Sequence, residues 1–128
     1  MNILKFRAWD KKLQILGTVS NIDFDFEEVT FYTDDEEGLE ICQPFEDVEI
    51  MQSTGLFDKN GKEIFEKDIV KYLGGEYSFI GVVEISAFGI FAKDKYDNYN
   101  FEDFADENTK KADVVVVGNI IEDKELLG

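Results

Sequence analysis

Histidine is absent from this chain, and cysteine and proline each occur once. Without histidine the chain cannot form a Ser-His-Asp or Cys-His nucleophile, and most transition-metal sites lose their usual ligand. Cys42 has no partner for an internal disulfide, and its acidic neighbours disfavour the reactive thiolate. We therefore expect Cys42 to be a small packing residue, and we expect no cofactor and no metal site.

Long apolar runs are also missing. The longest one, residues 114–117, is far shorter than a membrane span. The N-terminus has basic residues with no apolar stretch behind them, which is not typical of a signal peptide. We expect a cytoplasmic protein that does not enter a membrane. Its 128 residues predict a single domain over residues 1–128.

Lysine and arginine are absent from residues 13–58, although this span holds thirteen acids. The rest of the chain has 16 acids and 13 bases, so most of the net charge of −16 comes from this third. Such a concentration repels phosphate backbones and argues against direct binding of nucleic acid. It would attract a basic protein, or it is only a solvated face that keeps a β protein soluble.

The pattern that is present has a period of two residues. Alternation predicts short strands at residues 3–9, 21–26, 29–34 and 47–52. The β-branched run at residues 112–121 predicts a strand covered on both faces. No window has a sustained 3.6-residue repeat, so helix is expected only as short turns near residues 101–107 and 122–127. Many short strands predict a mainly β fold, a small barrel or sandwich with a barrel-like element.

Asn60-Gly61 is the strongest turn signal, because both residues tolerate the positive φ of a type I′ hairpin turn. We expect it to join strands at residues 54–58 and 62–66 and to have no ligand role.

Carboxylate chemistry has weaker support. An EF-hand frame on the acid-rich turns puts Leu56 and Lys67, or Thr33 and Pro44, at the first and last ligand positions, where acids are needed. Among 29 acids no particular pair stands out for acid–base catalysis. We expect the protein not to be an enzyme, and an enzyme with a carboxylate-based site ranks last among the hypotheses.

Three stretches carry a further signal: KFRAWDKK at 5–12, MQSTGLFDKNGKEIFEKDIV at 51–70 and VVGNIIEDKELL at 116–127. In this order, spread over the whole chain, they resemble the YopX family of phage and prophage proteins. Lys67 departs from the family pattern, which usually has Gly before the aspartate at position 68. The resemblance implies a mainly β fold, a bacteriophage protein in the host cytoplasm, and a family without an established activity.

Protein contact is the function that these observations favour. The candidate surface consists of outward-facing acids: Asp23, Asp25, Glu27, Asp34, Asp35, Glu36 and Glu37. We expect the first three to share a strand face, and a turn at residues 27–28 to fold the others back toward them as one continuous negative surface. The partner would be a basic host or phage protein. DNA mimicry, with carboxylates in place of phosphates, is a sharper form of this hypothesis, and a self-assembling structural module is the alternative.

Overall fold

The computed structural model describes residues 5–35, 37–74, 77–95, 97–101 and 105–123. These residues form two antiparallel sheets, and helix is limited to short 3-10 turns such as η1 (Phe45–Asp47). The predicted mainly β fold is confirmed. Within the described residues, neither sheet closes into a complete barrel.

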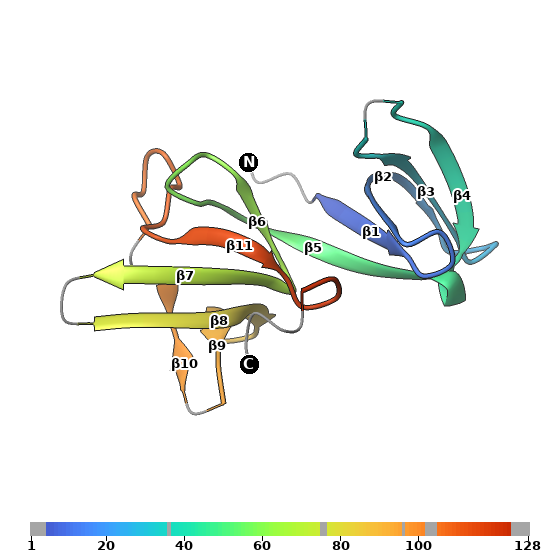
Figure 1. Ribbon diagram of the computed structural model, residues 1–128. Coiled ribbons are helices and arrows are strands. Elements are labelled where there is room, and N and C mark those ends of the chain that lie inside the picture. Colours follow the sequence, from blue (N-terminus) through green and yellow to red (C-terminus); the bar gives the residue numbers. More distant parts are fainter. Residues whose placement is uncertain (1–4, 36, 75–76, 96, 102–104, 124–128) are drawn as a thin grey trace. The chain divides into compact units, whose positions relative to one another are not determined.

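The chain packs into two compact units, residues 1–52 and 53–128. Strand β5 (Val48–Phe57) belongs to both (Figure 1). Its first half pairs with β1 (Phe6–Asp10), and its second half pairs with β6 (Glu63–Phe65). The single domain expected over residues 1–128 stays a prediction.

The first unit is a curled sheet. It adds β2 (Ile15–Asp23), β3 (Glu28–Thr33) and β4 (Glu40–Pro44), in the order β4-β3-β2-β1-β5. The side-chain nitrogen of Gln43 on β4 donates to Asp10 Oδ2 on β1 at 2.9 Å. Since two strands separate β4 from β1 in the sheet order, this bond requires strong curvature. The concave side holds a core that includes Val29 and Phe31.

Gly17 on β2 permits this packing. A Cβ at this position would lie 2.4 Å from the ring of Phe31, so a larger residue would displace that core side chain. The alternation predicted for residues 29–34 is confirmed: Val29, Phe31 and Thr33 are buried, and their neighbours are more exposed. β4 was not predicted, because its sequence contains polar residues and ends in Pro44, which suits an edge strand.

The second unit contains a five-stranded sheet. Its order is β10 (Asn98–Tyr99), β9 (Gly89–Lys93), β8 (Tyr77–Ser86), β7 (Asp68–Gly74) and β11 (Val115–Asn119). The core includes Leu56, Ile64, Val70, Val83 and Phe101. The helical turns predicted at residues 101–107 and 122–127 lie partly outside the described residues. Within the described ones, residue 101 forms a short 3-10 turn, and residue 105 forms a bridge with residue 112.

Strand β11 corrects one expectation. Val114 is buried and Val116 packs against the core, but Val115 is only half-buried and Val117 is 40% exposed. The strand is therefore covered on one face and open on the other. The expectation that the apolar run at residues 112–121 is covered on both faces is therefore wrong. β11 lies at the edge of its sheet, where one face of the strand can remain open to solvent.

The hairpin at residues 58–62 is confirmed, but the predicted turn type is wrong. Gly61 has a φ of +87°, whereas Asn60 does not have a positive φ. The Gly61 amide donates to the Asp58 carbonyl at 3.0 Å, and the Asp58 amide donates to the Lys62 carbonyl at 2.8 Å. These bonds define a three-residue loop, a type I turn followed by a left-handed glycine.

Asp58 holds this loop together and is only 2% exposed. Its Oδ1 accepts hydrogen bonds from the backbone amides of Asn60 and Lys62, both at 2.9 Å. Its Oδ2 accepts a third from the Val116 amide on β11 at 3.0 Å. One carboxylate thus links the β5–β6 loop to the outer edge of the five-stranded sheet.

We predict that Asp58→Asn destabilises the second unit by about 1.5–3 kcal/mol. The side-chain NH₂ of asparagine would face one of the three backbone N–H groups that Asp58 now accepts, and two donors cannot form a hydrogen bond. Urea unfolding would measure this loss. Lys62→Ala, at an exposed position of the same hairpin, is the control and should stay within about 0.5 kcal/mol of wild type. Equal stability of the two variants would contradict the role given to Asp58.

We predict that Gly61→Val costs at least about 1–2 kcal/mol, because a β-branched side chain resists the left-handed conformation. Asn60→Ala should cost much less, because the φ of Asn60 is ordinary. Urea unfolding of both variants distinguishes the observed turn from a type I′ turn, in which both substitutions would be costly.

Candidate protein-binding surface

The β2–β3 turn carries the first group of predicted surface acids. Asp23 is the last residue of β2, and Asp25 and Glu27 lie in the turn rather than on a strand. Asp23 Oδ1 accepts hydrogen bonds from the amides of Asp25 at 3.0 Å and Phe26 at 3.1 Å. The strand face expected for Asp23, Asp25 and Glu27 is therefore wrong. An aspartate that bonds the backbone two residues ahead reverses the chain instead of continuing the ladder.

The same turn exposes two aromatic rings. Phe24 is 77% exposed and Phe26 is 75% exposed. Phe24 meets the half-buried ring of Phe45 edge to face, with 5.9 Å between the ring centroids. A strand that continued through residue 26 would have placed both rings on one of its faces. The turn presents them to solvent among Asp25 and Glu27.

The β3–β4 turn carries the second group, Asp34, Asp35 and Glu37, while Glu36 lies outside the described residues. Asp35 Oδ1 accepts a hydrogen bond from the Thr33 hydroxyl at 2.8 Å and from the amides of Glu37 and Gly38, both at 3.1 Å. The Thr33 hydroxyl is the main reason that the pKa of Asp35 lies below its ordinary value, and the two amides add to the effect.

The two acidic groups lie at opposite ends of β3. This six-residue strand separates them by about 17 Å. The Asp34 amide bonds the Leu16 carbonyl near the start of β2, whereas Asp23 ends that strand. The expectation that a turn at residues 27–28 folds the second group back onto the first is therefore wrong.

Two acids that the candidate surface omitted, Glu28 and Glu40, lie between the groups. Both are exposed, and they sit near opposite ends of the paired strands β3 and β4. The Tyr32 hydroxyl donates to Glu40 Oε2 at 3.1 Å, and this carboxylate raises the pKa of Tyr32. The alternation of residues 28–33 could have identified Glu28, because it shares a face with Tyr32.

Cys42 lies on the same exposed face of β4. Its thiol donates to Glu28 Oε2 at 3.4 Å. The expectation that Cys42 is a packing residue is wrong, because the edge strand turns this position to solvent.

None of the six described candidate acids forms an ion pair with a described lysine or arginine. Lys12 instead pairs with Asp47 at 3.1 Å, beside the start of β5. Over the part of the chain described, no three acids or cysteines gather closely enough to hold a metal ion. In that same part, no helix has the length and apolarity needed to cross a membrane.

Among the described residues, most of the buried polar side chains lie in the three stretches that resemble the YopX family, 5–12, 51–70 and 116–127. Arg7 and Asp10 lie in the first stretch, Asp58 and Asp68 in the second, and Asn119 in the third. Asp10 repeats the arrangement at Asp58, since its Oδ1 accepts the amides of residues 12 and 13, both at 2.9 Å. These stretches therefore encode turns and buried polar side chains, and the exposed acids Asp25, Glu27, Glu28, Asp34, Asp35, Glu37 and Glu40 lie outside them.

The fold and this surface define a small, acidic, mainly β protein with two sheets and aspartate-stabilised turns. The model of the YopX protein family matches residues 5–128, and the chain belongs to that family. The crystal structure of protein EF1440 from Enterococcus faecalis is similar, with 27% identity over the full length of both chains and a TM-score of 0.65. No curated protein matches the chain.

The Thr33–Asp35 bond gives a prediction on pH. In wild type the Asp35 carboxyl should titrate below the usual aspartate value of 3.8. The stability that depends on its ionised form is complete above that value and is lost as the pH falls through the lowered pKa. Thr33→Val removes the main donor and should move the titration midpoint upward, which carboxyl carbon NMR would measure. Identical midpoints would show that the bond has no effect.

Proposed function

We propose that the protein acts by binding a basic protein of the phage or its host, in the host cytoplasm, through the acidic face of residues 1–52. The observation that carries this proposal is the exposed pair Phe24 and Phe26, which alternate with Asp25 and Glu27 in a turn fixed by Asp23. Exposed aromatic rings that no segment covers are typical of contact surfaces. Aromatic side chains also supply a large share of the binding energy in protein interfaces.

The acids and the rings have separate roles. Acids that form no ion pair with a described lysine or arginine attract a basic protein and raise the rate of association. The rings provide apolar area that is buried once the partner docks. Because hydrogen bonds to Asp23 already fix the turn, binding costs less conformational entropy than ordering a flexible loop would.

DNA mimicry remains the sharper form of this proposal. The two acidic groups about 17 Å apart, with Glu28 and Glu40 between them, would then take the place of phosphates. In that case duplex DNA should compete with the protein for its partner. Self-assembly is the alternative, and mass measurement at two protein concentrations distinguishes it from binding to another protein.

The proposal predicts that Asp25→Lys/Glu27→Lys slows association with the partner about tenfold or more and reduces its salt dependence. Asp23 is left unchanged, because its carboxylate fixes the turn. Phe24→Ser/Phe26→Ser keeps the charge and should mainly speed dissociation. Capture from host lysate at low salt would supply the partner, and surface plasmon resonance would measure both rates.

The matched control is Asp97→Lys/Glu107→Lys, which makes the same change in net charge at exposed positions of the second unit. It should leave association nearly as fast as wild type. A partner whose binding responds to neither salt nor the reversal at residues 25 and 27 would reduce the acidic face to a means of keeping the protein soluble.

A further inference from the structure

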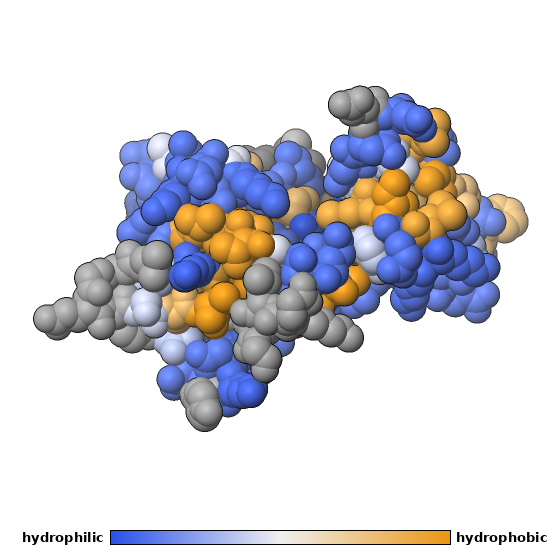
Figure 2. Space-filling view, in the orientation of Figure 1, coloured by the Kyte–Doolittle hydropathy of each residue, from blue (hydrophilic) through white to orange (hydrophobic). Residues whose placement is uncertain are grey.

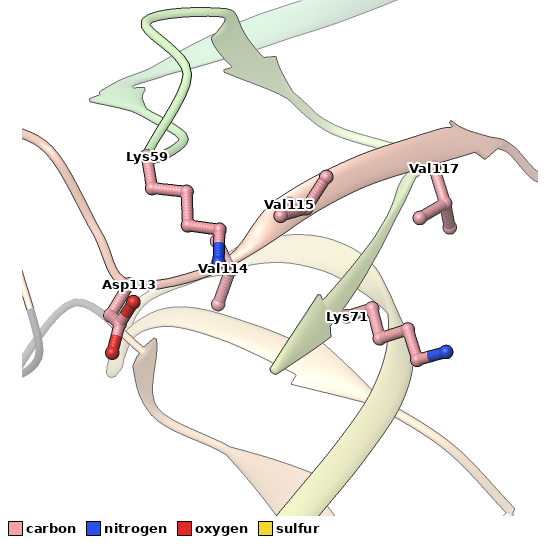
Figure 3. Close-up of a pocket in the computed structure, with 6 residues that line it drawn as sticks. All are labelled: Lys59, Lys71, Asp113, Val114, Val115 and Val117. Carbon is pink, nitrogen blue, oxygen red and sulfur yellow. The ribbon is translucent and has the colours of Figure 1, made fainter. Parts of the chain in front are cut away.

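The second unit contains a pocket on the open face of β11. Its volume is about 230 Å³, and it is lined by Lys59, Lys71, Asp113, Val114, Val115 and Val117 (Figure 3). Lys71 on β7 pairs with Val115 on β11 in the antiparallel register. The strand pairing therefore places Lys71 beside Val115, and the register shifts at Val117, the next residue of the strand that lines the pocket.

The floor of the pocket is apolar and incompletely covered. Val115 is half-buried and Val117 is exposed. Figure 2 shows apolar surface (orange) over β11, with hydrophilic surface around it. Burying these side chains under a ligand would remove apolar area from water, which is favourable.

Two lysines border this floor. The Lys59 amide bonds the Val114 carbonyl at 3.0 Å, so the Asp58 loop holds this residue beside the pocket. Figure 3 shows the Lys59 side chain extending toward Val114, and that of Lys71 extending away from Lys59. Neither ammonium group forms an ion pair with any described residue, in a chain of 29 acids and 13 bases.

Charge and size define the ligand. The two lysines favour a ligand with a negatively charged group. The carboxylate of Asp113, which lines the pocket with Lys59, would repel a second negative group, so a ligand with a single negative charge fits best. At about 230 Å³ the pocket is smaller than the roughly 300–1,000 Å³ of sites for drug-sized ligands, so it suits a small group. We propose that this pocket binds an aliphatic monocarboxylate, with its carbon chain on Val115 and Val117 and its carboxylate at Lys71.

Two sources could supply such a group, a free short-chain acid or the C-terminal aliphatic residue of a peptide. Hexanoate represents the first source, and N-acetyl-Ala-Leu with a free carboxylate represents the second. Titration of the intact protein, followed by amide and valine methyl NMR, would test both. Saturable shifts at Val115 and Val117 with at least one of them are expected, and the one that binds more tightly identifies the source.

Variants distinguish binding in this pocket from a general attraction of anions to lysines on the protein surface. Lys71→Gln should weaken binding about tenfold, the effect of losing one charge-assisted contact. Lys62→Gln removes the same charge from an exposed position outside the pocket and should leave affinity unchanged. Asp113→Asn should strengthen binding. Hexylamine carries the opposite charge on the same carbon chain and should not saturate the site.

Three results would overturn the proposal: shifts that stay linear with both acids, equal binding of hexylamine and hexanoate, or equal loss in the Lys71 and Lys62 variants. The pocket is formed only by residues of the second unit, and the proposed protein contact uses the first. Failure of either proposal therefore leaves the other standing.

Discussion

The carboxylate of an aspartate bonded to backbone amides just ahead of it is the interaction on which this fold depends. A protein made of short antiparallel strands must reverse its chain many times, and each reversal leaves amides without a ladder partner. One aspartate can accept two of them. Such bonds occur at Asp10, Asp23, Asp35, Asp58, Asp94 and Asp106.

Because of this interaction, the acids of the chain fall into two groups, those that stabilise the fold and those that are available for binding. Part of the negative charge is structural: Asp10 and Asp58 are buried, and each accepts a further hydrogen bond from a strand that is distant in sequence. Asp23 is half-buried and Asp35 is exposed, and the carboxylates of both fix turns. Asp25 and Glu27 form no side-chain bond with another described residue, so only acids of this kind are free to serve a partner without cost to the fold.

The sequence predicted those features that depend on local pattern. Alternation gave the strand at residues 29–34, because burial of Val29 and Phe31 requires a period of two, and Asn60-Gly61 gave the hairpin. The alternation pattern gave a wrong prediction at residues 23–27, because aspartate and phenylalanine can alternate both in a strand and in a turn. The side-chain bonds of Asp23 decide between them, and no period reveals those bonds.

The candidate surface shows the same limit. Composition identified the acidic third of the chain, but the separation of its two groups depends on strand β3, which lies between the two turns. Likewise the valine run at residues 114–117 predicted a strand, but its position at the edge of the sheet leaves one face open. Both features follow from tertiary arrangement, which residue types alone do not determine.

Both candidate surfaces begin at the residue that follows a turn aspartate. Asp23 fixes the turn that exposes Phe24 and Phe26, and Asp58 fixes the loop that holds Lys59 against β11. Each carboxylate accepts amides two to four residues ahead of it, and these bonds fix the loop in which the next residue, Phe24 or Lys59, lies. The device that reverses the chain therefore also presents side chains for binding, and substitutions in these turns can change the side chains while the aspartate keeps the fold.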